Sequence, residues 1–153
     1  MSAIEDRLSE LGVTLPEASA PAANYVPFVQ SGSTLYVSGQ LPFNNGDLIL
    51  GKVGDDLSVE EGAEAAKCCA IGLLTQVKAA CDGDLDRLVR VVKLTGFVNS
   101  TPDFTDQPKV INGCSNLMVE ALGDIGRHAR SAVSAGALPF NVAVEIEGIF
   151  EIK

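Results

Sequence analysis

The first apolar positions of the chain, in the segment AIEDRLSEL, follow a helical period and end at Gly12, which predicts a short leading helix over residues 1–12. Prolines and small residues fill residues 13–24, a composition that favours an extended arm over a helix or a paired strand. Two runs rich in β-branched and aromatic residues follow at 26–30 and 34–40. A loop of hairpin length joins them, so we expect an antiparallel pair.

The pattern changes from strand to helix in the next part of the chain. After the turn cluster NNGD, residues 48–54 predict a third short strand. Residues 58–81 then follow a helical period, and Ser58 and Glu61 are placed as a capping box. The apolar stripe of this helix is rich in small residues: Ala63, Ala66, Ala70, Leu73, Leu74, Val77 and Cys81.

A second strand and helix follow this long helix. Residues 88–98 are rich in β-branched residues and contain few polar ones, which is typical of a central strand. Residues 107–122 predict a helix that begins after Asp106 as its N-cap and ends at Gly123. Its apolar face consists of Val110, Ile111, Cys114, Leu117, Met118 and Ala121.

The C-terminal third gives the clearest strand pattern. Residues 142–152 alternate between an apolar face and an acidic face, and residues 129–140 predict a shorter strand that runs into a Gly/Pro loop. The order α, β-β-β, α, β, α, β-β predicts one α+β domain over residues 1–153, with two long helices on one face of a mixed sheet. The other face is left for water or for another subunit.

Composition and charge narrow the class of protein. A chain of 153 residues, 46% of them hydrophobic, is long enough for one well-buried core. Its formal net charge of −9 disfavours nucleic acid as a partner, because that affinity depends on Lys and Arg that neutralise phosphates. The acidic N-terminus and the lack of an apolar run of about 20 residues lead us to expect a cytoplasmic protein without a membrane partner.

The cysteines and the single histidine do not suggest a metal site. The four cysteines have no C-x-x-C spacing, and one histidine cannot supply a multi-histidine site. We therefore expect reduced, packed thiols and no metal. His128 by itself fits a loop or surface residue better than a general base.

Arg130 is the cation best suited to a ligand. It begins a strand of small residues, ARSAVSAG, which leaves space beside the guanidinium. Its planar fork matches a carboxylate, so it can hold a small organic acid in a cleft. An ordinary salt bridge to one of the 20 acidic residues is the simpler interpretation from composition alone. Glu145 shares its strand face with Glu147 and Glu151, and periodicity does not choose among them.

Several segments resemble one known family: LYVSGQLP at 35–42, VING at 110–113, and HARSAVSAGALP followed by VAVEIEGIF within 128–150. From about residue 20 to the C-terminus the chain resembles the YjgF/Rid group of reactive-intermediate deaminases, also called endoribonuclease L-PSP. Within this group it is most similar to a longer subgroup with an extra N-terminal helix. The resemblance implies a chorismate-mutase-like fold and a homotrimer in which the sheets form a central barrel, with three clefts between subunits.

The resemblance also implies the residues of a site to which two chains contribute. Arg130 matches the family's carboxylate-binding arginine, and Glu145 matches the acid that orders the attacking water. The other matches are expected to bind substrate: Tyr25 closes the cleft, Ser38 and Gly39 line it, and Asn112 lies near the pocket.

The chain departs from the family pattern along the arginine strand. Many members read RSCVEVARLP, whereas Ala132, Ser134 and Ala137 stand here at the positions of the Cys, the Glu and the second Arg. If the family uses that cysteine through its backbone carbonyl, Ala132 can serve in the same way as a substrate-binding residue. The substitutions bear on substrate range and rate.

The reaction implied is hydrolysis of 2-aminoacrylate-type enamines and imines to 2-oxo acids and ammonia. Such imines already hydrolyse in water, so catalysis needs orientation, a positioned water and proton management, but no metal or other cofactor. Two alternatives stay open. One is a non-catalytic regulatory trimer that binds 2-oxo acids. The other, less favoured by the net charge of −9 and the single histidine, is an endoribonuclease or translation inhibitor.

Overall fold

The computed structural model describes residues 2–19 and 24–153, and a five-stranded mixed sheet lies at its centre. The strand order is β1-β2-β7-β5-β6, and only β5 and β6 pair in parallel. The strands are β1 (Phe28–Ser31), β2 (Thr34–Gln40), β5 (Leu88–Asn99), β6 (Ala129–Ala135) and β7 (Val144–Ile152). The expected α+β fold with a mixed sheet is therefore confirmed.

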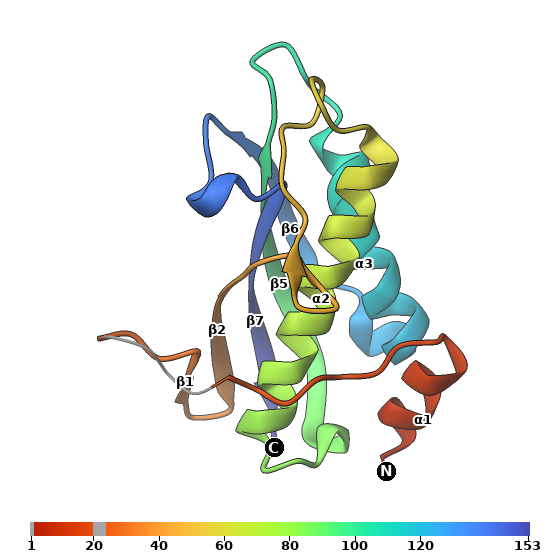
Figure 1. Ribbon diagram of the computed structural model, residues 1–153. Coiled ribbons are helices and arrows are strands. Elements are labelled where there is room, and N and C mark those ends of the chain that lie inside the picture. The colour runs from red at the N-terminus through yellow and green to blue at the C-terminus, as the bar shows by residue number, and fades with distance from the viewer. Residues whose placement is uncertain (1, 20–23) are drawn as a thin grey trace.

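Two long helices, α2 (Val59–Ala80) and α3 (Gln107–Leu122), cover one face of this sheet (Figure 1). The predicted capping box of α2 is present, because the Glu61 N–H donates to Ser58 Oγ and the Ser58 N–H donates to the Glu61 carboxylate, both at 3.1 Å. Asp106 occupies the N-cap position of α3, but its side chain makes no capping bond there. The shorter leading helix, α1 (Ala3–Glu10), contacts α3.

Small residues let the helices approach each other and the sheet closely. A Cβ at Gly113 of α3 would overlap the backbone carbonyl of Ala63 in α2. A Cβ at Gly96 of β5 would likewise meet the side chain of Ile111. These two glycines therefore set the position of α3, the helix that carries the candidate site residue Asn112.

The third strand expected at 48–54 does not form in the main sheet. Instead β3 (Phe43–Asn44) and β4 (Asp47–Leu48) make a separate two-stranded hairpin. Asn45 and Gly46 between them both have positive φ, 51° and 89°, and this turn folds the chain directly back on itself. Beyond the hairpin, Gly51 at φ 129° interrupts the extended backbone, so that residues 50 and 53 form only isolated bridges.

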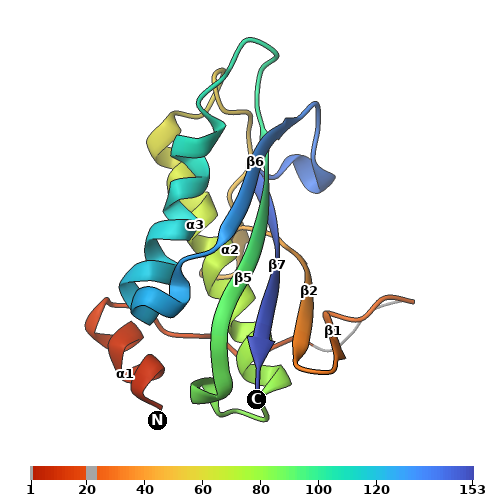
Figure 2. The same cartoon turned by 180° about the vertical axis from the view of Figure 1, so that it is seen from behind.

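The sheet face opposite the helices carries exposed apolar side chains. Both views of the ribbon show α2 and α3 on one side of the sheet, while the short helix η3 (Pro139–Asn141) projects on the other (Figure 2). Tyr36, Val92 and Val133 lie on this open face and are between 40% and 49% exposed. In the described residues the two long helices thus cover one face only, as the sequence predicted.

Candidate functional site

Arg130 lies on the edge strand β6, on the helix side of the sheet, where α3 holds its guanidinium. Its Nη1 donates to Asn112 Oδ1 at 2.8 Å and to Ser115 Oγ at 3.1 Å. Both Nη1 hydrogens are thereby engaged. Within residues 2–19 and 24–153 no side chain forms an ion pair with Arg130, and nothing accepts from its Nε or Nη2.

This arrangement leaves one edge of the Arg130 guanidinium available. The Nε and Nη2 groups point their hydrogens in the same direction, and that edge can bind a carboxylate through two parallel hydrogen bonds. Asn112 and Ser115 hold the guanidinium through its other nitrogen. The salt bridge that composition suggested for Arg130 is not formed by the described residues.

The ring of His128 extends the same cluster. His128 precedes β6 and follows the short helix η2 (Gly123–Gly126). Its Nε2 lies 2.9 Å from Ser115 Oγ, and its Nδ1 lies 2.6 Å from the backbone carbonyl oxygen of Gly126. Burial and the nearby positive charge of Arg130 lower the pKa of His128, while the bond to Gly126 opposes this effect.

Sequence reasoning missed this cluster. His128 does lie in a loop, as the sequence suggested, but it is half-buried and directly hydrogen-bonded to a neighbour of Arg130. Ser115 lies in no sequence motif that would mark it as a functional residue. The one available clue was its spacing, three residues after Asn112 on a predicted helix, which places both side chains on one helix face.

Ala132 follows Arg130 on the same side of β6. It pairs with Gly96 of β5 and is partly buried against the core. Its methyl side chain has no polar group, so only its backbone can form a hydrogen bond to a ligand. Ser134, two residues further on, has its Oγ 2.7 Å from Ser100 Oγ.

Glu145 belongs to a second group of residues, on the open face of the sheet. Its carboxylate lies beside Gly39, where an added Cβ would be 3.0 Å from Glu145 Cδ. Burial raises the pKa of Glu145, and the negative charge of Glu147 raises it further. Glu145 is therefore a partly buried carboxylate beside a glycine, whereas Glu147 on the same strand is exposed.

Ser38 and Tyr25 lie at the edge of this second group. Ser38 Oγ donates to the Val26 carbonyl at 2.8 Å, and the Ser38 N–H donates to the Pro27 carbonyl at 2.9 Å. These bonds tie the segment that carries Tyr25 to β2, next to Gly39. The Tyr25 side chain is 65% exposed.

The register of the sheet separates Arg130 from Glu145 within one chain. Arg130 pairs with Leu94 of β5, and Glu145 pairs with Phe97 of the same strand. Since these partners differ by an odd number of residues, the two side chains point to opposite faces. Two strand spacings and three residue rises place their Cα atoms on the order of 14 Å apart. The structure therefore brings the predicted residues together as two groups and not as one site.

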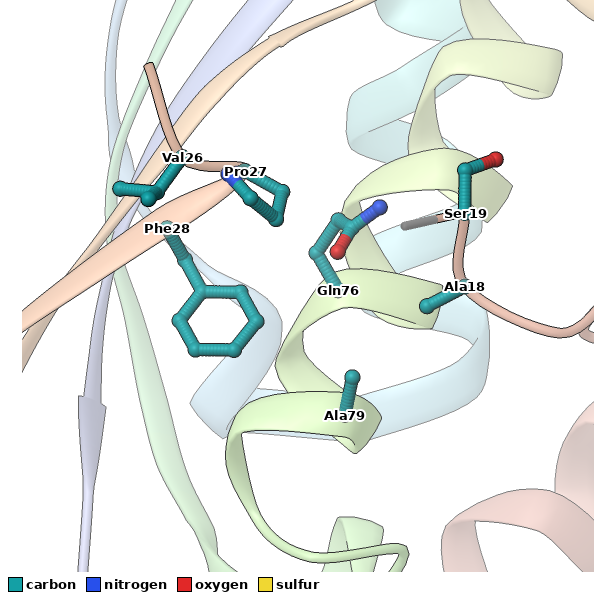
Figure 3. A pocket seen from close by; sticks show the side chains of 7 residues that line it. All are labelled: Ala18, Ser19, Val26, Pro27, Phe28, Gln76 and Ala79. Carbon is teal, nitrogen blue, oxygen red and sulfur yellow. The ribbon is translucent and has the colours of Figure 1, made fainter. Parts of the chain in front are cut away.

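A hollow of about 280 Å³ lies elsewhere, between the N-terminal arm and α2 (Figure 3). Its lining is Ala18, Ser19, Val26, Pro27, Phe28, Gln76 and Ala79. The side-chain oxygen of Gln76 is buried there, and none of the described residues donates a hydrogen bond to it. The hollow contains none of the predicted site residues, but it adjoins the second group, because Val26 and Pro27 of its lining accept hydrogen bonds from Ser38.

Buried thiols and the rest of the described chain show no metal-binding cluster. All four cysteines are free and buried, and burial raises the pKa of Cys114 to about 12. In residues 2–19 and 24–153 no three His, Cys, Asp or Glu side chains come together in a way that could hold an ion. Within the same ranges, each helix is too short or too polar to cross a membrane.

Comparison with known proteins gives consistent matches over the chain. Residues 5–151 match the family model described as "YjgF/chorismate mutase-like, putative endoribonuclease". Protein TCP17 of Trypanosoma cruzi is 51% identical over 95% of this chain and 92% of its own length. A 2-iminobutanoate/2-iminopropanoate deaminase of Dermatophagoides farinae is 29% identical over 92% of this chain and 95% of its own. The crystal structure of a protein of unknown function from Agrobacterium tumefaciens has a TM-score of 0.93 and 55% identity, covering 99% of this chain and 93% of that one.

Proposed function

The chain belongs to the YjgF/chorismate mutase-like family, and we propose that it hydrolyses enamines and imines of small 2-amino acids to 2-oxo acids and ammonia. One observation carries this proposal: Arg130 is held by Asn112 and Ser115 through Nη1 alone, and its Nε and Nη2 edge faces no acidic partner among the described residues. A small carboxylate fits this edge. A 29% identical relative named as an imine deaminase supports the same class of substrate.

In the proposed reaction, each group of residues has a separate task. Arg130 binds the carboxylate of the 2-imino acid and fixes the position of its C=N carbon. Glu145, with a backbone carbonyl, orients the water that attacks this carbon. The water oxygen forms a bond to this carbon, and the C–N bond then breaks. Ammonia departs, and the product is a 2-oxo acid.

We propose further that each complete site lies between two copies of the chain, in a homotrimer. Arg130 and Glu145 lie on opposite faces of one sheet, so a single chain cannot place both beside one small substrate. The open face also exposes Tyr36, Val92 and Val133, and an apolar face of this kind is typical of a surface that another subunit covers. In a closed ring of copies, a neighbouring chain would bring its Glu145 to Arg130 and would also cover the apolar face.

Mixing two inactive variants tests this proposal. Release of ammonia and 2-oxo acid from freshly generated 2-iminobutanoate is first measured for wild type, Arg130→Ala and Glu145→Gln. The two variants are then unfolded, mixed in equal amounts and refolded. In a trimer with one Arg130 and one Glu145 from neighbouring chains at each site, random mixing restores about a quarter of wild-type activity.

The matched control is the double variant Arg130→Ala/Glu145→Gln refolded with either single variant, which restores nothing because no site then holds both residues. Sizing by light scattering confirms the trimeric state of each sample. Absence of acceleration by wild type would contradict the deaminase. Acceleration by wild type without recovery on mixing would contradict the two-chain site.

A second candidate function is a trimer that binds 2-oxo acids without turnover. Ala132 favours it, since the chain has no thiol where many relatives carry one beside the arginine. The same samples decide between the two functions: calorimetric binding of 2-oxobutanoate that depends on Arg130, together with no imine hydrolysis, would select the binder. An endoribonuclease remains the less favoured alternative because of the net charge of −9.

A further inference from the structure

Three hydrogen bonds run in one direction from Arg130 into the body of the protein. A carbonyl oxygen only accepts, so His128 Nδ1, 2.6 Å from the Gly126 oxygen, carries a proton and donates it. In the neutral ring Nε2 is then the acceptor, and Ser115 donates its hydroxyl proton to it at 2.9 Å. The Ser115 oxygen in turn accepts from Arg130 Nη1 at 3.1 Å.

Each of these bonds fixes the group that makes the next one. The Gly126 carbonyl selects the tautomer and the orientation of the ring, and the ring directs the hydroxyl proton of Ser115 away from Arg130. The lone pairs of Ser115 Oγ are thereby left for Arg130 Nη1. Asn112 Oδ1 accepts the second Nη1 hydrogen at 2.8 Å, so two acceptors on one nitrogen define the plane of the guanidinium.

We propose that Ser115 and His128 are positioning residues for Arg130, and that a carboxylate bound to Arg130 is coupled to the uptake of a proton by His128. The inference rests on the proposed function, because it concerns the same carboxylate site, and it gives neither residue a contact with the substrate. An arginine side chain has many rotamers and loses conformational freedom when a ligand immobilises it. Here Nη1 is held before a ligand arrives, so the Nε and Nη2 edge keeps one orientation.

The coupling follows from the charge that Arg130 places beside the ring. Burial and this positive charge lower the pKa of His128 below its ordinary 6.5, so the ring is neutral at pH 7. A carboxylate on Arg130 offsets the positive charge and makes protonation of the ring easier. Ser115 Oγ can then accept from both His128 Nε2 and Arg130 Nη1, so the guanidinium keeps its support when the ring is charged.

Two further arginines lie near the ring, and both are exposed. Arg127 precedes His128 and pairs with Asp124 of η2 at 3.6 Å. Arg90 of β5 donates to the Arg127 carbonyl at 2.9 Å. Water and salt screen the charges of exposed side chains, so these residues act on His128 less than Arg130 does.

The other charges on the elements around the ring face elsewhere. Lys93 of β5 directly precedes the residue that pairs with Arg130, so its side chain points to the opposite face of the sheet. On α3, Glu120 lines a groove toward α2, and Lys109 forms an ion pair within the first turn of the helix. A ligand on Arg130 is therefore the charge whose arrival changes the ionisation of His128.

Linkage fixes the sign of this coupling. The pKa of His128 is lowered in the free protein, and a bound carboxylate moves it back toward its ordinary 6.5. Over this range the complex holds more protons than the free protein. The affinity for the carboxylate therefore rises as the pH falls below 6.5.

Affinity at high pH tests the positioning role. The Kd for 2-oxobutanoate, from calorimetry, and KM and kcat for 2-iminobutanoate are compared at pH 8 in wild type, Ser115→Ala, His128→Ala and the double variant. We expect Kd and KM to rise on the order of 10-fold in Ser115→Ala, with a smaller fall in kcat, because Arg130 binds the carboxylate in the ground state as well as in the transition state. His128→Ala should add nothing in the Ser115→Ala background, since the neutral ring acts through Ser115.

The pH dependence tests the coupling. His128 is the only histidine of the chain, so its titration is followed by NMR in the untagged protein. We expect saturating 2-oxobutanoate to raise the pH at which the ring titrates, and Kd to fall about threefold between pH 8 and pH 5.5. His128→Gln is the matched variant, because glutamine can accept from Ser115 but does not titrate, so Kd should be near wild type at pH 8 and fall less. Glu145, whose pKa is also raised, is common to both proteins, so the difference between them belongs to His128.

Asn116→Ala, an exposed amide at the next position of α3 that faces the groove toward α2, is the control and should keep the wild-type Kd. A wild-type Kd in Ser115→Ala would overturn the positioning role, and a His128 titration that the ligand does not move would overturn the coupling. Thermal melting of every variant separates these outcomes from unfolding.

Failure of this inference and failure of the deaminase are distinguishable. Either contrary result leaves the deaminase intact as long as wild type hydrolyses 2-iminobutanoate. Binding of 2-oxobutanoate with the expected effects at Ser115 and His128, but without hydrolysis, would refute the deaminase and support the inference. Absence of any 2-oxobutanoate binding by wild type would overturn the inference together with the role of Arg130.

Discussion

The carboxylate of Glu145 lies against the bare backbone of Gly39, such that a Cβ at position 39 would sit 3.0 Å from Glu145 Cδ and 3.3 Å from its Oε2. In Gly39→Ala we expect the flexible end of Glu145 to turn away while the sheet stays in place. The kcat for 2-iminobutanoate should fall about 10-fold or more, because the attacking water loses its position.

The stability of Gly39→Ala should change little, with Tm within about 3 °C of wild type, or about 1 kcal/mol. Gly136→Ala is the matched control, since a Cβ there meets nothing within 4 Å. Equal losses of activity in both alanine variants would contradict the role given to Gly39.

Glu145 should also make the fold less stable at neutral pH. Its folded-state pKa is raised by burial and by Glu147, so the native state binds more protons than the unfolded state just above pH 4.5. The free energy of unfolding therefore falls as pH rises through the raised pKa. We expect Glu145→Gln to melt above wild type at pH 7, with the difference shrinking toward zero below pH 4.5, while deaminase activity is lost.

Glu147→Gln provides the comparison for this effect. It removes the weaker of the two causes and keeps the Glu145 carboxylate, so a smaller rise in Tm is expected, with activity retained. A Tm of Glu145→Gln that is lower than wild type at pH 7 and independent of pH would show that the carboxylate stabilises the sheet instead.

Arg130→Lys tests the shape of the cation at constant charge. A lysine ammonium cannot bond Asn112 and Ser115 and also present a planar pair of donors to a carboxylate. We expect the Kd for 2-oxobutanoate, measured by calorimetry, to rise on the order of 100-fold, close to the effect of Arg130→Ala. Arg90→Lys, an exposed arginine on the neighbouring strand, is the control. Retention of wild-type affinity in Arg130→Lys would reduce the role of Arg130 to charge alone.

The elements that could be predicted from sequence are those fixed by neighbours in the chain. The Ser58–Glu61 capping box and the alternation along 142–152 depend on residues within a few positions of one another, and both were predicted correctly. The strand expected at 48–54 did not form in the main sheet. The turn at Asn45 and Gly46 pairs residues 43–44 with residues 47–48 instead. The sequence named the turn residues but did not show which flanking run they would pair.

The candidate site depended on contacts that sequence does not contain. Arg130 and Asn112 are 18 residues apart, and their pairing requires α3 to lie over β6 at one particular rotation. That Arg130 and Glu145 face opposite sides follows from strand register, which only the folded sheet defines. The family resemblance pointed to Arg130 and Glu145 and implied a site shared by two chains, but it did not point to Ser115.

The position of α3, and with it of Asn112 and Ser115, should depend on Gly113. A Cβ there would overlap the carbonyl of Ala63, a backbone group that cannot turn aside. Alanine gains about 1 kcal/mol over glycine in helix propensity, but forced separation of the two helices costs about 1–3 kcal/mol. We expect Gly113→Ala to lower Tm by several degrees and to lower kcat as well, because α3 carries the partners of Arg130.

Gly72→Ala is the matched control for the loss of stability, since it makes the same change within α2 but meets the side chain of Gln40, with Oε1 at 2.9 Å. A side chain can move where a backbone carbonyl cannot, so this variant should keep more of its Tm than Gly113→Ala. Differential scanning calorimetry of the two variants measures the difference. If both alanines lowered Tm equally, the close contact of α2 and α3 at Gly113 would not be what positions the Arg130 cluster.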